Sequence, residues 1–238
     1  MEVVEKVMEK SPYKHVNQKF VEKLAGLIKS DIEEEKVKLV RAKLRKISTS
    51  ALSMKFYKKF KTLEFSKEVL DMHRSTRERA DIYSWLISKI EKSGKIIDLG
   101  CGFNLLAFYY NEFLPAEYKG YDIDEAVVQF VNRFAHEKKL NAKVESQDVS
   151  EIDFEEADVC LCLKIFDALE DVEKNVAKTI LGKMSKKTKL IIASFSNISL
   201  SGRGQLRERK WFEKMLQELG LKFKKESKGN EIFYFIES

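Results

Sequence analysis

The spacing of hydrophobic residues divides the chain into two parts. In residues 1–92 the apolar positions recur every three or four residues, which predicts amphipathic helices. Two such series are Val16, Phe20, Leu24, Leu27 and Ile28, followed by Val37, Val40, Leu44 and Ile47. Ser11-Pro12 fits the start of a helix, because proline suits the first helical turn. We expect a helical domain over residues 1–70.

From Lys95 onward, short apolar runs alternate with helical stretches. Strands are predicted at residues 95–99, 118–123, 142–149, 158–165, 189–195, 221–227 and 231–236. Helices are predicted at residues 103–113, 124–140, 169–184 and 205–219. Strands that alternate with helices form a mainly parallel sheet, and the closing pair of strands adds an antiparallel edge. The predicted fold over residues 71–238 is therefore α/β, in the Rossmann-like layout of the class I methyltransferases.

The composition excludes several classes of protein. Of the 238 residues 44% are hydrophobic and 34% are charged, which is too apolar for a disordered chain. No apolar run reaches the roughly 18 residues of a membrane-spanning helix, and the first ten residues lack the apolar core of a signal peptide. Three cysteines without a CxxC pair predict neither a disulfide framework nor a metal site. We expect a cytoplasmic protein that does not contact membranes, and we assume a monomer.

Positive charge is concentrated near the N-terminus. Residues 1–95 hold 23 Lys and Arg against 14 Asp and Glu, and residues 41–61 hold no acidic residue. Such a surface can bind RNA phosphates, although a solvated lysine-rich face gives the same pattern. We expect the interleaved Phe56, Tyr57 and Phe60 to pack in the helical domain rather than stack on bases. The predicted RNA-binding residues are Arg41, Lys43, Arg45, Lys46, Lys55, Lys58, Lys59 and Lys61, with Arg203 and Arg207 in a second basic cluster.

A glycine-rich loop follows the first predicted strand. The segment Asp98–Asn104 reads DLGCGFN, and glycines are needed where a chain turns sharply against a ligand. Asp122 ends the second predicted strand, where a carboxylate can accept both hydroxyls of an adenosine ribose. Asp148 ends the third, where it can accept the adenine amino group. These elements together indicate an S-adenosylmethionine site; a dinucleotide site and a purely structural turn are the alternatives.

A second motif, HRSTRER at His73–Arg79, lies between the two parts of the chain. Its cationic side chains and small hydroxyls could hold a carboxylate, such as the one at the methionine end of the cofactor. The same residues fit a helix start, with Ser75 or Thr76 as the cap and Glu78 completing a capping box. Both interpretations can hold at once.

Several motifs in this order resemble the FmrO family of aminoglycoside-resistance 16S rRNA methyltransferases. They are HxSTxER at 73–79, DxGCGxN at 98–104, YxxYDID at 118–124, LxLKxxxxLE at 161–170 and SFxxxSLxGR at 194–203. The resemblance implies a Rossmann-like, S-adenosylmethionine-dependent enzyme with a helical ribosome-binding domain. It further implies transfer of a methyl group to a guanine N7 of 16S rRNA in the assembled small ribosomal subunit.

The resemblance also implies which residues hold the cofactor. His73, Arg74, Ser75 and Arg79 would bind its methionine end, Asp122 its ribose, and Asp148 and Val149 its adenine, with Leu163 in the wall. The predicted cofactor site is completed by Gly100, Gly102, Asn104 and Ile123.

The sequence defines the target base less sharply than it defines the cofactor site. Residues 194–202 and 102–106 depart from the family's SFPTKSLGG and GLNPL, near the expected base-docking site. Candidates for contacting the base are Lys164, Asp167 and Asn197.

The chemistry of possible acceptors favours guanine N7. Methylation of an exocyclic amine, such as cytosine N4, usually relies on a Pro-Pro loop after the fourth strand, and this sequence lacks that loop. The lone pair of guanine N7 is already nucleophilic, so its methylation needs no general base and depends mainly on positioning. Methylation at cytosine carbon 5 needs a thiolate, but Cys160 and Cys162 fit a buried strand better. Another rRNA base, a protein or small-molecule substrate, and a non-catalytic role in ribosome assembly stay open.

Overall fold

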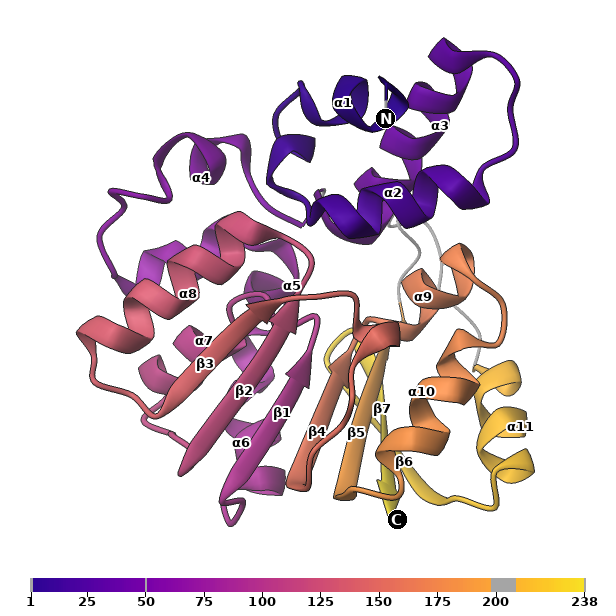
Figure 1. The fold of residues 1–238 in the computed structure, drawn as a ribbon. Helices are drawn as coiled ribbons and strands as arrows, with labels where there is room; N and C mark the ends of the chain where they lie inside the picture. The colour runs from indigo at the N-terminus through magenta and orange to yellow at the C-terminus, as the bar shows by residue number, and fades with distance from the viewer. Residues whose placement is uncertain (1, 50, 198–208, 238) are drawn as a thin grey trace.

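The computed structural model describes residues 2–49, 51–197 and 209–237 (Figure 1). A seven-stranded sheet forms its centre, with the strand order β3-β2-β1-β4-β5-β7-β6. The strands are β1 (Lys95–Leu99), β2 (Glu117–Asp122), β3 (Ala142–Ser146), β4 (Ala157–Leu163), β5 (Thr188–Ser196), β6 (Lys222–Lys228) and β7 (Glu231–Glu237). Strands β1 to β5 pair in parallel, and β7 runs antiparallel to β5 and to β6. The predicted α/β layout with an antiparallel edge is therefore confirmed.

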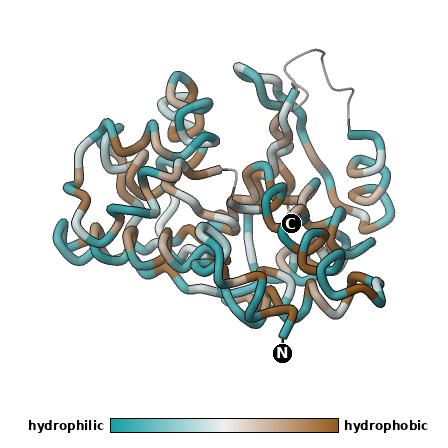
Figure 2. The backbone as a smooth tube through the Cα atoms, turned by 90° about the horizontal axis from the view of Figure 1, so that it is seen from above, coloured by the Kyte–Doolittle hydropathy of each residue, from teal (hydrophilic) through white to brown (hydrophobic). Residues whose placement is uncertain are grey.

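Helices flank the sheet and precede it. They are α1 (Glu2–Met8), α2 (Gln18–Leu27), α3 (Glu33–Leu44), α4 (Met54–Lys59), α5 (Arg74–Glu78), α6 (Tyr83–Ile90), α7 (Asn104–Tyr110), α8 (Glu125–Glu137), α9 (Phe166–Val172), α10 (Val176–Met184) and α11 (Lys210–Glu218). In Figure 2 the flanking helices change between hydrophilic and hydrophobic along their length, as amphipathic helices do. Among the described residues no helix is long and apolar enough to cross a membrane, and no group of His, Cys, Asp and Glu could hold a metal ion.

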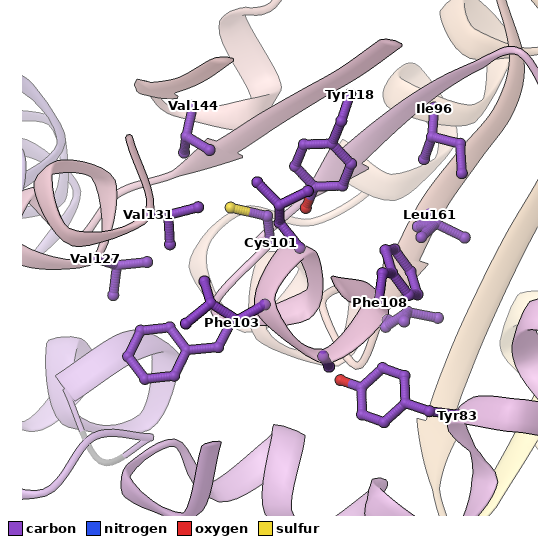
Figure 3. Packing of buried hydrophobic residues seen from close by; sticks show 14 of the residues in the cluster. Tyr83, Ile96, Cys101, Phe103, Phe108, Tyr118, Val127, Val131, Val144 and Leu161 are labelled. Atoms are coloured by element: carbon purple, nitrogen blue, oxygen red, sulfur yellow. The ribbon is translucent and has the colours of Figure 1, made fainter. Parts of the chain in front are cut away.

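Each face of the sheet has its own core, because successive side chains of a strand point to opposite faces. Ile96 packs with α6, α7 and α8, and its neighbour Ile97 packs with α9, α10 and α11 (Figure 1). Figure 3 shows the first of these cores, where the ring of Phe108 packs edge-on against Tyr118, with centroids 6.4 Å apart. Cys160 and Cys162 are fully buried against Met184, as expected for core thiols.

The helices before the sheet divide between two cores. Helices α1, α2 and α3, with the π-helical segment Arg45–Thr49, pack around a core of their own, and we call residues 2–48 the N-terminal bundle. The segment from Leu52 to Val69 instead packs into the core of the sheet. A division of the chain at residue 70 stays a prediction, but this packing groups residues 52–69 with the sheet.

Several predicted elements differ in their bounds. The helix expected at 169–184 is two helices, α9 and α10, because Asn175 adopts a left-handed conformation (φ 64°) and the Glu170 carboxylate accepts bonds from the Asn175 and Ala177 amides. Strand β3 stops at Ser146, before Asp148 caps a short 3-10 turn. Residues 205–208 lie outside the described residues, and α11 begins at Lys210.

Phe56 gives a test of the packing of the segment 52–69. Its ring is fully buried, with centroids 5.2 Å from Phe103 and 5.3 Å from Phe130. We expect Phe56→Ala to lower the free energy of unfolding by about 3–5 kcal/mol, because the change leaves a cavity. Urea denaturation measures this loss. Met54→Ala, on the same helix but 46% exposed, serves as the control and should change stability by no more than about 0.5 kcal/mol. A loss no larger for Phe56→Ala than for the control would contradict the packing.

Candidate functional site

One pocket lies at the carboxyl ends of β1, β2, β3 and β4, which is where open α/β sheets bind ligands. Most of the predicted cofactor residues line it: His73, Ser75, Arg79, Gly100, Asn104, Asp122, Ile123, Asp148, Val149 and Leu163. Lys164 lines it as well. Arg74 and Gly102 are not among its lining residues. The structure therefore brings together residues that lie far apart in the sequence.

The glycine loop is held by its neighbours on both sides. Gly100 (φ 66°) and Gly102 (φ 48°) both adopt left-handed conformations. The Gly102 amide donates to Asp122 Oδ2 at 3.0 Å. A Cβ atom at position 102 would lie 2.5 Å from His73 Cε1, so the histidine ring closes over the loop. The loop needs glycine at position 102 both for its backbone angles and for this contact.

Below the loop lies a fully buried polar cluster. Asn104 donates to Asp98 Oδ2 at 2.9 Å and accepts from the Tyr83 hydroxyl at 2.7 Å. Tyr118 also donates to Asp98 Oδ2, at 2.7 Å. Burial raises the pKa of Asp98 to about 6. Asn104 thus anchors the start of α7 beneath the pocket.

Asp122 stands at the end of β2 with its carboxylate fixed. Its Oδ1 accepts from the Asp124 amide at 2.9 Å, and burial raises its pKa. Asp124 caps α8 and accepts from the Tyr57 hydroxyl at 2.5 Å. Burial raises the pKa of Asp124 to about 7. Backbone amides thus orient both carboxylates.

Asp148 is 6% exposed and forms an ion pair that the sequence did not predict. Its Oδ2 lies 2.7 Å from Nζ of Lys23, which comes from helix α2 of the N-terminal bundle. Its Oδ1 accepts from the Ser150 amide at 2.9 Å. A sequence separation of 125 residues explains why no local pattern predicted this pair.

The HRSTRER motif is both a helix start and a pocket wall, but the residue that caps the helix differs from the prediction. The cap of α5 is His73 rather than Ser75 or Thr76, since His73 Nδ1 accepts from the Thr76 amide at 3.3 Å. Burial, with the charge of Arg79 as a smaller cause, lowers the pKa of His73 to about 3, so the ring is neutral and can accept. Arg74 is turned away from the pocket and pairs with Glu78 at 2.8 Å.

Arg79 is 2% exposed and is neutralised inside the protein. Its Nε lies 3.1 Å from Oε1 of Glu231, the fully buried first residue of β7, and its Nη1 lies 3.3 Å from Asn104 Oδ1. Burial works against both charges, but each charge stabilises the other, which raises the pKa of Arg79 and lowers that of Glu231. The arginine expected to capture a carboxylate of the cofactor therefore already holds a carboxylate of the chain.

The three candidates for contacting a base differ in position. Lys164 (φ 60°) follows β4 and lines the pocket, with its Nζ 3.0 Å from Glu78 and 3.1 Å from Glu231. Asp167 is not among the residues that line the pocket, and it pairs with Arg209 at 2.7 Å. Asn197 follows β5, and its side-chain oxygen is buried without a hydrogen-bond partner among the described residues.

The predicted RNA-binding residues fall into two groups. Arg41, Lys43, Arg45 and Lys46 have partners within the protein: the Lys6 and Val7 carbonyls, Asp171 and the Tyr13 hydroxyl. Lys55, Lys58, Lys59 and Lys61 are exposed. The interleaved aromatics Phe56, Tyr57 and Phe60 are buried, as predicted. Arg203 and Arg207 lie outside the described residues.

The sequence missed the contribution of the N-terminal bundle to the pocket. Phe20 of α2, with Ile47 and Ser48 of the π-helical segment, forms part of its lining, next to Ala51 and Leu52. Phe20 and Ile47 were predicted only as apolar positions of helices, and nothing in their spacing distinguishes a pocket wall from a core. Other unpredicted lining residues are Cys101, Asp124, Val127, Ile165, Ala168 and Leu169.

Solved structures share this fold over nearly the whole chain. The 16S rRNA methyltransferase RmtF, in complex with S-adenosyl-L-homocysteine, has a TM-score of 0.84 at 22% identity, covering 99% of this chain and 96% of its own. The 16S rRNA methylase RmtB has a TM-score of 0.77 at 21% identity, covering 100% of this chain and 97% of its own. The 16S rRNA methylase ArmA is 29% identical, with a TM-score of 0.60 over 77% of this chain and 96% of its own.

Sequence comparison gives the family. No curated protein matched the chain. A family model described as ribosomal RNA methyltransferase (FmrO) matches residues 62–235, which include the pocket residues from His73 to Leu169, strand β6 and most of strand β7. The chain therefore belongs to the FmrO family of ribosomal RNA methyltransferases and is an S-adenosylmethionine-dependent enzyme.

Proposed function

We propose that this enzyme methylates N7 of a guanine in 16S rRNA, acting as a cytoplasmic monomer on the assembled small ribosomal subunit. The observation that carries the proposal is that the polar groups at the end of β4 are fixed as ion pairs, as Lys164 is between Glu78 and Glu231. The 16S rRNA enzymes RmtF, RmtB and ArmA, which share the fold, support the choice of rRNA.

The residues at the pocket suit an adenosyl cofactor. The Asp122 carboxylate faces the pocket at the end of β2, where it can accept both ribose hydroxyls. Asp148 stands at the adenine end, with Val149 and Ile123 as apolar surfaces beside it. His73, Ser75 and the glycine loop border the methionine end, whereas the Arg79–Glu231 pair supports the wall behind Asn104.

The groups beside the pocket decide which acceptor chemistry the site suits. When bound, S-adenosylmethionine supplies an electrophilic methyl group, whose transfer to a guanine N7 lone pair removes no proton from the base. Lys164 is paired with two carboxylates, and the Asn197 amide cannot take up a proton. A site of this kind works by positioning the base rather than by general base catalysis. Cytosine N4 has to lose a proton when it is methylated, and neither Lys164 nor Asn197 is suited to accept that proton.

The exposed lysines of α4 and its flank support binding to a ribosomal particle. Lys55, Lys58, Lys59 and Lys61 are exposed, and no acidic residue interrupts them between residues 41 and 61. Helix α4 is itself packed on the sheet through Phe56, so these charges are presented on a fixed support. An array of this kind binds phosphates and gives salt-dependent affinity.

The proposed substrate is tested by methyl transfer from labelled S-adenosylmethionine. We expect label in small subunits, with little in large subunits, naked rRNA or tRNA, and mass spectrometry of the nucleosides should identify 7-methylguanosine. Methylated cytidine in the same rRNA would reject the N7 assignment while keeping the substrate. No label in any RNA would reject the proposal as a whole.

Asp122 tests the cofactor assignment. Asp122→Ala removes the acceptor for the ribose hydroxyls, and loss of about two charged hydrogen bonds should weaken binding of S-adenosyl-L-homocysteine roughly 100-fold or more. Isothermal titration calorimetry measures this change. Asp153→Ala, at an exposed carboxylate outside the pocket lining, is the control. Unchanged affinity in Asp122→Ala would remove Asp122 from the site.

The exposed lysines test binding to the subunit. Replacing Lys55, Lys58 and Lys59 by Glu should weaken binding and make the dependence of log affinity on log salt shallower by about one for each phosphate that the variant no longer neutralises. Filter binding over a range of salt concentrations measures both effects. The matched control replaces three other lysines by Glu: Lys222, Lys224 and Lys228, which are exposed on the edge strand β6. Equal effects in the two triple variants would show that only total charge matters.

A further inference from the structure

The N-terminal bundle is fastened to the sheet at the adenine end of the pocket. Asn17 caps α2. Its backbone amide donates to the Ile123 carbonyl at 2.7 Å, and its side-chain amide donates to the Ser146 hydroxyl at 3.0 Å. These bonds fix the first turn of α2 on the ends of β2 and β3. Figure 1 shows α2 lying across this end of the sheet.

Lys23 lies one turn further along the same helix. Its Nζ is 2.7 Å from Asp148 Oδ2, 2.7 Å from the Ser150 hydroxyl and 3.8 Å from Glu173 Oε2. Burial alone lowers the pKa of Lys23, but the bond to Asp148 and the nearby carboxylates outweigh it, and the pKa is raised. The ammonium therefore stays charged and keeps the Asp148 carboxylate in one orientation.

The bundle is also attached to α9. Lys43 donates to the Asp171 carbonyl, and Lys46 lies 3.8 Å from the Asp171 carboxylate at the end of α9. Phe20, Ile47 and Ser48 of the bundle line the pocket. The bundle thus forms part of the pocket wall and has charged contacts with Asp148 and with α9.

We propose that Lys23 is a positioning residue for the cofactor, through which the N-terminal bundle controls how tightly the adenine end is held. Lys23 uses part of the acceptor capacity of Asp148 and leaves the rest, because each carboxylate oxygen accepts two hydrogen bonds. The adenine amino group and the ammonium then bind the same carboxylate from two sides. This inference rests on the proposed role of Asp148.

The arrangement has a consequence for the ribosomal particle. A partner that contacts both the bundle and the exposed lysines of α4, which is packed on the sheet, also steadies Lys23 on Asp148, and so strengthens cofactor binding. By linkage, bound cofactor then strengthens binding of the particle by the same factor. Methyl donor and substrate reinforce each other through one ion pair.

The first experiment compares two ligands in calorimetry: S-adenosyl-L-homocysteine and S-inosyl-L-homocysteine, whose base lacks the amino group. Lys23→Met should weaken binding of the adenosyl ligand about 10-fold, as expected for removal of a charged hydrogen bond, and should reduce its advantage over the inosyl ligand. Lys23→Arg should restore in large part both the affinity for the adenosyl ligand and its advantage over the inosyl ligand. Lys19→Met, on the exposed surface of the same helix, is the control and should change neither.

Unchanged or tighter binding in Lys23→Met overturns the proposal. An equal loss for both ligands also overturns it, because a purely structural role would weaken both alike.

The second experiment measures release of S-adenosyl-L-homocysteine with and without small subunits. Subunits should slow release from the unmodified enzyme and have little effect in Lys23→Met. Subunit binding with unaltered release from the unmodified enzyme overturns the coupling. Absence of subunit binding instead rejects the proposed function, and the calorimetric comparison still decides the role of Lys23.

Discussion

The ion pair between Arg79 and Glu231 connects the parts of the chain that form the pocket. It joins residues 152 positions apart, the end of helix α5 and the start of strand β7, and both side chains are nearly inaccessible to solvent. Ser194 of β5 donates to the same Glu231 carboxylate at 2.7 Å, and Arg79 reaches Asn104 at the start of α7. Losing one partner of a buried pair costs about 3–5 kcal/mol, because the other charge is left without compensation.

This pair also sets the electrostatics of the pocket. Glu231 holds Lys164, and Lys164 in turn holds Glu78, so the charges near the end of β4 form one chain of contacts. On the far side, Asp122 is oriented by two backbone amides and Asp148 by Lys23. The protein itself holds these groups in position, and preorganised groups need little rearrangement when charge moves during a reaction.

Local features of the sequence predicted the parts of the fold and site that depend on local interactions. The strands, the glycine loop and the acidic residues at the strand ends follow from short apolar runs and from the positions of Gly100, Gly102 and Asp122. The break between α9 and α10 was missed, because it depends on Glu170 capping a helix that begins six residues later.

The contacts of the two arginines at the site could not be predicted from the sequence, for a different reason. Arg79 and Arg74 look equivalent in the HRSTRER motif, yet one is buried against Glu231 and the other pairs with Glu78 on the surface. Only the path of the chain in space decides between these outcomes. The same holds for Lys23 and Asp148, whose pairing depends on how the N-terminal bundle packs on the sheet.

The wall that Phe20, Ile47 and Ser48 contribute to the pocket means that the N-terminal bundle is not an independent module. In many multidomain enzymes a recognition domain can be exchanged for another without altering the catalytic centre. Here an exchange would also replace the surface that encloses the cofactor and the cation that holds Asp148. Recognition and donor binding must therefore evolve together, and a chimera that alters one has to rebuild the other.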